Sequence, residues 1–426
     1  LLNSMPSLAI NNMSRVWLND NQITQLPALP DSLRYLNFSN NLISTVPFIS
    51  APKLDTLLLS ENQVSIAPSF AGALNLLDFS HNLISSIPNF PSMTDNCKIY
   101  ASHNLITSIS PLPSSLTHFY VSNNAGLSSL IPMPNSLNYL DCSYCNLSQL
   151  NALPPALSTL QCSKNPLIQG IGTLPSTLIN LYADSSQLTV LPDLPASLFR
   201  LQVKGNQLTE LNNLPLGLRY LNASGNQLTT ISSNSTEFSQ FLVNNNPNLY
   251  CLPPILKFWG SQSSSNQFSI AGTGISCLPN VIEYSFTSPM FDTLAPCGMF
   301  SNPNDCQIFW NIAGNVFLES NQDCIQNNDE PNLNSIKVML KQGSEVIQQA
   351  FTNINGWYSF NTDLTEYLVV VDTLDTPFQP ICPIDNTIIC NPGANGDTLL
   401  TGITFGLTCE PGFDLSAISM VHTGGL

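Results

Sequence analysis

Charged residues are scarce in this sequence, and basic residues are the scarcest of all. Only 9% of the 426 residues are charged, and 11 Lys and Arg stand against 27 Asp and Glu, which gives a net charge of −16. Nucleic acids and anionic membrane surfaces are bound mainly through clustered Lys and Arg. The composition therefore argues against both as partners.

Long apolar runs and enzyme motifs are also missing. A transmembrane helix needs about 18 or more consecutive apolar residues, and the sequence contains no such run, so we expect no membrane insertion. We find no nucleophile elbow, no phosphate-binding loop and no pair of carboxylates with catalytic spacing. The sequence therefore predicts that the chain is not an enzyme.

What the sequence does contain is a repeat. The stretch "LNFSNNLISTVP" at 36–47 returns as "LDFSHNLISSIP" at 77–88, with a looser copy, "LLLSENQVSIAP", at 57–68. A period in the twenties is typical of a solenoid. Alignment on the last residue of each LxxLxLxxN segment gives twelve repeats, spaced by 20 to 22 residues, at Asn21, Asn41, Asn62, Asn82, Asn104, Asn124, Cys145, Asn165, Ser186, Asn206, Asn226 and Asn246.

Each repeat predicts a short strand followed by a turn and an extended return. Alternate side chains of the Leu-x-Leu segment would point into the solenoid. The recurring Asn lies where the chain leaves the strand, so its side-chain amide would satisfy backbone groups that the turn leaves unpaired. Proline recurs in the return segments, as at Pro27, Pro47 and Pro192, which favours polyproline-like walls over helices.

The stretches "LPALPDSLRYLNFSNNLI" and "LPLGLRYLNASGNQLTTI" carry the pattern most plainly. They resemble the leucine-rich repeat, and the LPxLPxxL connector resembles its bacterial subclass. The resemblance covers residues 1–250 and implies a mainly β fold, a solenoid of about 12 repeats with short parallel strands and an extended convex side. It also implies that the concave face binds a partner.

We assign residues 251–305 to a C-terminal cap and linker, because the last turn of a solenoid would otherwise expose its core. Eight of the 12 cysteines lie beyond the repeats, at Cys251, Cys277, Cys297, Cys306, Cys324, Cys382, Cys390 and Cys409. An even number of cysteines in a loop-rich region favours disulfides and export. We expect Cys251 to pair with Cys277, since the two bracket the capping segment.

Residues 306–412 read as separate strands joined by turn residues. The strands are expected in "NIAGNVFLES" (311–320), "SIKVMLKQ" (335–342), "EVIQQAFTNI" (345–354), "GWYSFN" (356–361) and "EYLVVVD" (366–372). The segment resembles the B-type β-sandwich of Gram-positive surface adhesins, an Ig-like fold, with landmarks at Gly314, Thr352, Gly356, Tyr358 and Phe360. Residues 413–426 would begin a further domain or linker, and we expect both ends of the chain to belong to something larger.

One loop is a candidate calcium site. The twelve residues "ESNQDCIQNNDE" (319–330) place oxygen donors at the spacing of a calcium-binding loop. The donors would be the side chains of Glu319, Asn321, Asp323, Asn327 and Glu330 and the carbonyl of Ile325. Glu stands where Asp is usual at the first position, and Cys324 replaces the usual Gly at the sixth. The alternative is a polar turn held by its own hydrogen bonds and a Cys324 disulfide.

Aromatic residues recur at outward-facing strand positions and are the candidate ligand-binding residues. They are Trp17, Tyr35, Tyr100, Tyr120, Tyr139, Tyr182 and Tyr220, with Tyr144 and Phe199 in the same group. Exposed aromatic side chains on a rigid sheet are frequent anchors for proteins or sugars. The alternative is that aromatic residues simply suit strands and cover their neighbours.

Two pairs of equivalent residues invite a chemical interpretation. His81 and His103 occupy the same position in adjacent repeats, and stacked strands would bring them within about 5 Å, so a shared metal ion is one interpretation and plain surface histidines the other. Cys142 and Cys162 share an inward position, where buried free thiols are the default and a disulfide is the alternative.

Taken together, these patterns predict a recognition or adhesion protein, outside the cell or on a bacterial outer surface, that binds protein or glycan. The whole resembles large exported Bacteroidota proteins, which use type IX secretion and carry O-linked sugar at Asp-Ser/Thr-Leu. The candidate sugar sites are Thr293, Thr373 and Thr398. The alternative is a structural component of a surface or filament assembly, bound to its other subunits, or exported secretion-system cargo with no ligand of its own.

Overall fold

The computed structural model describes residues 2, 13–90, 93–166, 170–259, 267–284, 294–394 and 398–410. The described part is mainly β and holds no α-helix. Leu1–Leu211 and Tyr220–Gln227 form one compact unit, and Asn212–Arg219 and Leu228–Leu426 form the other. A search of the described residues for a helix long and apolar enough to span a bilayer finds none.

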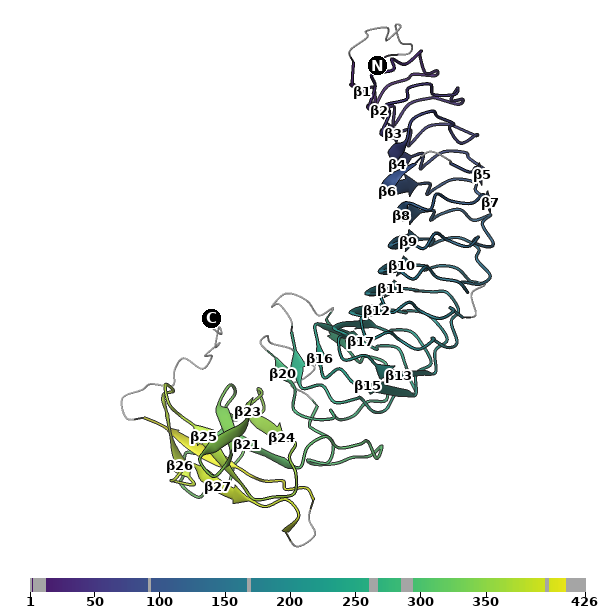
Figure 1. Cartoon of the computed structure of the whole chain (residues 1–426). Helices are drawn as coiled ribbons and strands as arrows, with labels where there is room; N and C mark the ends of the chain where they lie inside the picture. The colour runs from purple at the N-terminus through teal and green to yellow at the C-terminus, as the bar shows by residue number, and fades with distance from the viewer. Residues whose placement is uncertain are drawn as a thin grey trace. The chain divides into compact units, whose positions relative to one another are not determined.

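Short parallel strands form one sheet of thirteen, as the repeats predict (Figure 1). In order, the strands are β1 (Arg15–Trp17), β2 (Tyr35–Asn37), β3 (Thr56–Leu58), β4 (Leu74–Asp78), β6 (Met93–Tyr100), β8 (Leu116–Tyr120), β9 (Tyr139–Asp141), β10 (Thr159–Gln161), β11 (Asn180–Tyr182), β12 (Arg200–Gln202), β14 (Tyr220–Asn222), β17 (Gln240–Leu242) and β19 (Phe268–Ser269). We call the face formed by these strands the concave face.

The middle residue of each three-residue strand points into the solenoid. Leu36, Leu57 and Leu160 are fully buried, while both flanking residues of their strands are half-buried. Burying one such leucine stabilises the fold by roughly 1.5–3 kcal/mol relative to leaving it exposed. Because the pairing register aligns Leu140, Leu160 and Leu181, these side chains form a continuous core along the solenoid.

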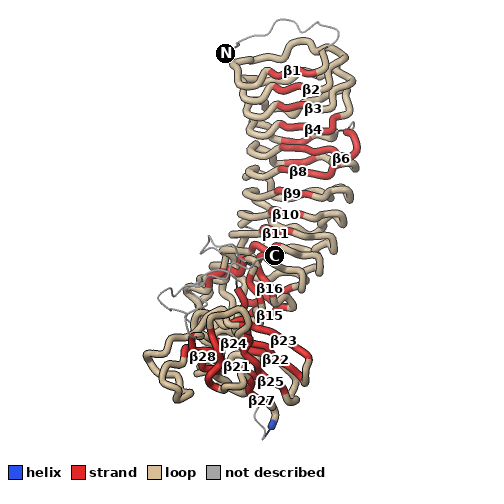
Figure 2. The backbone as a smooth tube through the Cα atoms, turned by 90° about the vertical axis from the view of Figure 1, so that its left-hand side faces the viewer, coloured by secondary structure: helices blue, strands red, loops and turns tan. Residues whose placement is uncertain are grey.

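The return segments are extended rather than helical, and they are tan between the red strands of Figure 2. Two pairs of very short strands interrupt them: β5 (Ser86–Ile87) pairs with β7 (Ser108–Ile109), and β13 (Glu210–Leu214) pairs with β15 (Thr230–Ser233). The proline-rich composition of these segments predicted this outcome, because proline disfavours a helix interior.

The predicted asparagine ladder is present. Asn104 accepts a hydrogen bond from the Ile84 N–H at 3.0 Å through Oδ1. Its Nδ2 donates to the carbonyl of Phe79 in the preceding turn at 3.0 Å and to that of Ala101 in its own turn at 3.2 Å. Two ladder positions hold other residues, and both keep a donor: the Cys145 thiol donates to the Val121 carbonyl and the Ser186 hydroxyl to the Cys162 carbonyl.

The residue before each ladder position has a left-handed backbone. We call these residues the left-handed column; their φ angles lie between 53° and 67°, at Asp20, Asn40, Glu61, His81, His103, Asn123, Tyr144, Lys164, Ser185, Gly205, Gly225 and Asn245. This conformation costs most L-residues roughly 1–2 kcal/mol, whereas Gly, Asn and Asp adopt it more readily. The sequence analysis did not predict this column.

In the second unit, the capping segment continues the parallel pairing. β18 (Lys257–Phe258) lies between β16 (Glu237–Phe238) and β20 (Glu283–Tyr284). Buried Asn280 acts like a ladder residue, since it accepts from the Ile255 N–H at 3.1 Å and donates to the Ile255 carbonyl at 2.7 Å.

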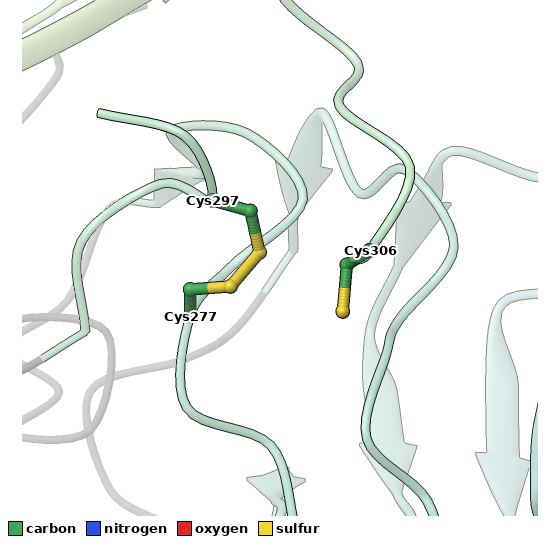
Figure 3. A group of neighbouring side chains, drawn as sticks. All are labelled: Cys277, Cys297 and Cys306. Atoms are coloured by element: carbon green, nitrogen blue, oxygen red, sulfur yellow. A yellow bond between two sulfur atoms is a disulfide. The ribbon is translucent and has the colours of Figure 1, made fainter. Parts of the chain in front are cut away.

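Two disulfides fasten this segment, and our expected pairing was wrong. Cys251 bonds to Cys306. Cys277 bonds to Cys297, and Figure 3 shows this second bond with Cys306 nearby. Cys251 and Cys277 lie at the two ends of the segment, but they do not bond to each other. The chain after Cys277 folds back, so that Cys297 reaches Cys277 and Cys306 reaches Cys251. The four sulfurs, with Ile308, make a small buried cluster of their own.

Beyond the cap, two four-stranded sheets share one core. One sheet has the order β24 (Trp357–Phe360), β21 (Ile312–Leu318), β28 (Phe405–Cys409), β26 (Phe378–Cys382), and the other β23 (Glu345–Phe351), β22 (Lys337–Gln342), β25 (Tyr367–Asp372), β27 (Thr387–Cys390). Tyr358 is fully buried and donates to the Ile403 carbonyl at 2.6 Å. A Cβ on Gly314 would lie 1.7 Å from the same carbonyl oxygen, so only glycine fits there.

Candidate functional site

The aromatic residues of the concave face occupy two outward columns. Trp17, Tyr100, Tyr120 and Tyr182 end their strands, whereas Tyr35, Tyr139 and Tyr220 begin theirs. The strand register therefore brings some rings together and separates others. Tyr144 does not belong to either column, because it lies in the left-handed column, where its side chain is 54% exposed.

The densest group lies on β6, β8 and β9. The rings of Tyr100 and Tyr120 are parallel within 6°, with centroids 4.4 Å apart. Tyr139 follows diagonally, 4.8 Å from Tyr120, and it also stacks on His118 at 5.9 Å. All four side chains are half-buried.

Two histidines of the left-handed column lie on the same stretch of turns. The rings of His81 and His103 stack at 4.1 Å and are parallel within 12°. We call His81, Tyr100, His103, His118, Tyr120 and Tyr139 together the tyrosine–histidine patch. Nitrogen lone pairs lie in the ring plane, so two stacked rings cannot both aim one at a common ion about 2 Å away. This geometry disfavours the metal interpretation of the pair.

Burial and neighbouring groups shift the pKa values of four members of the patch in the direction that favours their uncharged forms. Burial and the neighbouring Tyr100 raise the pKa of Tyr120, and burial and Asp141 raise that of Tyr139. Burial and the adjacent His81 lower the pKa of His103, while burial and Lys98 lower that of His118. The Tyr139 oxygen accepts from Gln161 Nε2 at 2.7 Å, which leaves its own proton free to be donated.

Other predicted aromatic residues form smaller groups. Trp17 lies against Tyr35 with centroids 5.4 Å apart. Phe199 lies 5.3 Å from Tyr220, and the Arg200 guanidinium stands 3.9 Å above the Tyr220 ring. The sequence analysis missed this cation–π contact, although Arg200 and Tyr220 hold the same position in adjacent repeats.

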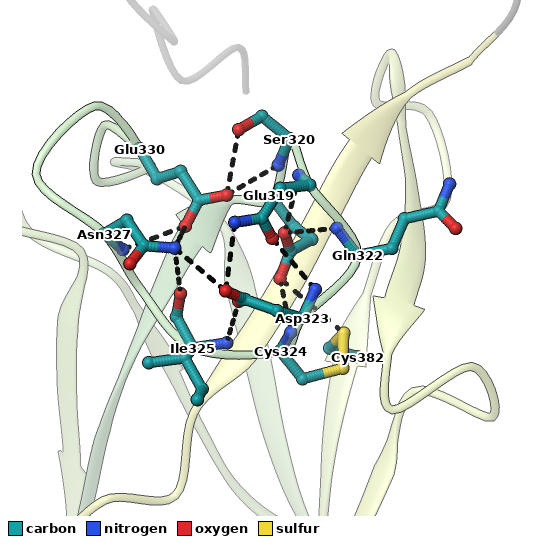
Figure 4. The surroundings of a disulfide bond; sticks show 10 residues. Glu319, Ser320, Gln322, Asp323, Cys324, Ile325, Asn327, Glu330 and Cys382 are labelled. Atoms are coloured by element: carbon teal, nitrogen blue, oxygen red, sulfur yellow. Dashed lines mark hydrogen bonds between the residues drawn. A yellow bond between two sulfur atoms is a disulfide. The ribbon is translucent and has the colours of Figure 1, made fainter.

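The predicted calcium loop brings its acidic side chains together (Figure 4). Carboxylate oxygens of Glu319, Asp323 and Glu330 all lie within 4.8 Å of one another. Glu319 and Glu330 are buried, and the backbone N–H groups of Ser320 and Asn327 lower the pKa of Glu330 to about 2. The pKa of Asp323 is also lowered, chiefly by the Ile325 N–H.

The remaining predicted donors surround these carboxylates. The amide nitrogens of Asn321 and Asn327 both donate to Asp323 Oδ2, at 3.0 and 3.2 Å, and Asn327 also donates to the Ile325 carbonyl. A cation here would be held by oxygens, so both amides would have to rotate. Cys324 has φ of 59°, which is the backbone that glycine usually supplies at this position. Its disulfide to Cys382 joins the loop to β26.

The remaining cysteines are free thiols. Cys142 and Cys162 are fully buried in the repeat core and unbonded, as their default interpretation predicts. Six of the eight cysteines beyond the repeats form disulfides, while Cys390 and Cys409 are free. Of the candidate sugar sites, Thr398 is exposed and Thr373 half-buried, and Thr293 lies outside the described residues.

Comparison with known proteins decides the fold of the repeats. YopM, a leucine-rich effector protein from Yersinia pestis, aligns with 72% of this chain over 86% of its own, at 24% identity and a TM-score of 0.52. The chain has the leucine-rich repeat fold. InlJ from Listeria monocytogenes aligns with 96% of this chain over 85% of its own, at 16% identity and a TM-score of 0.38. No family model and no curated protein matches the sequence.

The site contains features that the leucine-rich repeat pattern alone does not reveal. The consensus marks outward positions, but it does not show that Tyr120 meets Tyr139 diagonally, because this requires the strand register. The consensus also does not reveal that His81, His103 and Tyr144 have left-handed backbones. This chain's own sequence does carry a signal for it, because Gly205 and Gly225 occupy the equivalent position in later repeats and glycine is typical of positive φ.

Proposed function

We propose that this chain is a non-enzymatic recognition protein that binds a protein or glycan through the concave face of its leucine-rich repeats. The observation that carries the proposal is the tyrosine–histidine patch, where the half-buried rings of Tyr100, Tyr120 and Tyr139 and the exposed rings of His81 and His103 are held against one another. Rigid aromatic side chains lose little entropy on binding and are enriched among residues that dominate interfaces.

The test compares the full chain with a variant that replaces concave aromatic residues. Tyr120→Gln, Tyr139→Thr and Tyr220→Thr introduce residue types that the same columns already hold at Gln161 and Thr159, so the fold should persist. The proteins are presented to a glycan array and to a library of random-sequence peptides. Ligands that bind the parent and not the triple variant support the proposal. It is rejected if every ligand binds both proteins equally.

We further propose an extracellular or bacterial outer-surface location, with export by type IX secretion. Three disulfides support an oxidising compartment, since such bonds are rare in the cytosol. Proteomic detection of the chain in the surface and medium fractions of its source tests this proposal. Recovery in the cytosolic fraction alone, with reduced thiols, would contradict it.

For the second half of the chain, we propose a cap and linker over 251–305 and a B-type β-sandwich over 306–412. The two four-stranded sheets with a shared core support this assignment, as does the place of Gly314 beneath Tyr358. Residues 413–426 lie outside the described part of the chain. Expression of 306–412 alone, with a cooperative unfolding transition, would support an independent module, whereas an unfolded product would contradict it.

We also propose that the 319–330 loop binds calcium. The support is its chemistry: three carboxylates, two amides and the Ile325 carbonyl are hard oxygen donors within one loop. Thr373, Thr398 and Thr293 are proposed O-glycosylation sites on the sequence pattern alone. Peptide mass analysis of protein from the native source tests them, and three unmodified threonines would exclude that proposal.

A further inference from the structure

Histidine and tyrosine are concentrated on one part of the leucine-rich repeats. The chain contains 4 histidines, and the three within the described residues, His81, His103 and His118, lie on adjacent turns. Four of the 11 tyrosines, including Tyr144, fall between residues 100 and 144. Elsewhere the outward columns of the described strands hold mostly Asn, Gln, Thr and Leu, with aromatic residues at Trp17, Tyr35, Tyr182 and Tyr220 but no histidine, so the combination of histidine and tyrosine is a property of these turns and not of the repeat.

One side chain of this group accepts an unfavourable backbone. In the left-handed column, the first two and last three turns hold Asp20, Asn40, Gly205, Gly225 and Asn245, which adopt positive φ readily. His81 and His103 belong to a residue type that is also enriched at positive φ, whereas Tyr144, like Glu61, Lys164 and Ser185, is not. The fold does not require an aromatic ring at this position of the turn, because Asn123 occupies the same position in the turn between those of His103 and Tyr144.

The ring arrangement limits the chemistry of the ligand. A sugar packs on the open face of an aromatic ring, yet Tyr100 and Tyr120 each cover one face of the other, and Tyr139 stacks on His118 and is tilted by 34° against Tyr120. What they present are ring edges, which carry partial positive charge, and hydroxyl groups. The Tyr139 proton is free to be donated, because its oxygen accepts from Gln161. Both features attract carbonyl oxygens.

The charges around the patch favour an uncharged ligand. Lys98 stands beside His118, and Asp78 and Asp141 are the strand partners of Tyr100 and Tyr120. Both aspartates already accept a serine N–H, from Ser80 and Ser143. One lysine and two aspartates leave a net charge of −1 beside the patch, which is too small to select a strongly charged ligand.

We propose that the tyrosine–histidine patch, with Tyr144, binds an extended and uncharged segment of a partner protein, whose backbone carbonyls accept hydrogen bonds from the tyrosine hydroxyls. This inference rests on the proposed recognition role of the concave face and narrows it to one ligand class and one group of turns. The contacts run along the patch across successive strands, so several carbonyls of an extended chain are engaged together.

The test uses the full chain and peptides selected against it from a random-sequence library. Tyr120→Gln with Tyr139→Thr should weaken binding of the selected peptides by about tenfold or more, as expected for interface anchors. Gln202→Thr, on the same face but outside the patch, is the control and should leave the affinity unchanged, and Tyr220→Thr is measured beside it. Charged peptides should not dominate the selection.

A second set of variants separates a binding role from a structural one. His103→Asn and Tyr144→Asn place a residue suited to positive φ, so each should raise the melting temperature while weakening peptide binding. Ser185→Gly is the matched control in the same column, and it should raise the melting temperature without changing binding. A merely structural role for His103 and Tyr144 would leave peptide affinity intact in all three variants.

Several outcomes would overturn the inference and leave the proposed function standing. Binding that depends on Tyr220 and not on the patch places the site elsewhere on the concave face. Selection of glycans only, or of acidic or basic peptides only, contradicts the ligand class. If neither the peptide library nor the glycan array yields a ligand sensitive to any concave variant, both the inference and the proposed function fail.

Discussion

The imidazole rings of His81 and His103 lie parallel with centroids 4.1 Å apart, on adjacent turns of the leucine-rich repeats. Adding a proton to one ring disfavours adding a proton to the other, because two positive charges at this distance repel. Burial is the larger cause and the neighbouring His81 the second, and together they hold the pKa of His103 below its ordinary value. His103 is therefore neutral over most of the physiological pH range.

This relationship predicts how stability depends on pH. The pKa of His103 is lowered in the folded chain, whereas in the unfolded chain it is about 6.5. The unfolded state therefore binds more protons as pH falls through about 6.5, and the stability contributed by neutral His103 is lost there. The contribution is small because the side chain is exposed. NMR titration of the ring protons should show His103 titrating below 6.5, and a midpoint at or above this value would contradict the stacked geometry.

Removing one ladder residue should strongly destabilise the chain. Asn165 Oδ1 accepts from the Leu147 N–H at 3.1 Å, and Nδ2 donates to the carbonyls of Cys142 and Cys162 at 3.1 and 2.8 Å. Asn165→Ala leaves the Leu147 N–H and the Cys142 carbonyl without this partner, at about 1–3 kcal/mol each, whereas the Cys162 carbonyl keeps its bond from the Ser186 hydroxyl. We expect a loss on the order of 3 kcal/mol in urea unfolding. Asn138→Ala, at an exposed position, should cost less than about 0.5 kcal/mol, and equal losses in the two variants would contradict the ladder's role.

The Cys324–Cys382 disulfide should stabilise the second unit. It closes a sequence separation of 58 residues, and removing such a bond costs about 2–4 kcal/mol, chiefly because the unfolded chain gains freedom. The double variant Cys324→Ser, Cys382→Ser should therefore unfold at a lower urea concentration. Cys409→Ser, which removes a half-buried free thiol, is the control and should change stability by less than about 1 kcal/mol. An unchanged midpoint in the double variant would show that the bond adds nothing.

Calcium should raise the melting temperature of the second unit. An ion that binds only the folded state adds about 2.7 kcal/mol at a hundredfold excess over its dissociation constant. Glu330→Gln removes one of the buried carboxylates and should abolish the calcium-dependent shift. Asp329→Asn changes the neighbouring exposed carboxylate and should retain it. Calorimetry with calcium or chelator measures both, and no shift in the parent protein would exclude the site.

Much of the fold follows from the sequence because the same local pattern occurs once in every leucine-rich repeat. The ladder, the alternation around Leu36 and the extended returns were all predictable from one repeat, since each turn contacts only its neighbours. The strands at 312–318, 337–342, 345–351, 357–360 and 367–372 were predicted because they alternate or are β-branched. β26, β27 and β28 were not predicted as strands, and Pro380 interrupts the first of them.

Other features depend on contacts that no local pattern encodes. The pairing of Cys251 with Cys306 brings together residues 55 positions apart and requires the path of the capping segment. The thirteenth strand, Phe268–Ser269, carries none of the consensus leucines, so only its hydrogen bonds to β17 reveal it. The diagonal contact of Tyr120 with Tyr139 requires the register of β8 on β9.

The left-handed column has a consequence for the evolution and engineering of this chain. Its residues share one backbone conformation and differ widely in side chain, from Gly205 to Tyr144 and Lys164. A single codon change at any of these positions alters the surface chemistry of one turn while the leucine core and the ladder stay as they are. New specificities can therefore be acquired one turn at a time. Gly205 and Gly225 show that the column also accepts a residue with no side chain, at which the positive φ causes no strain.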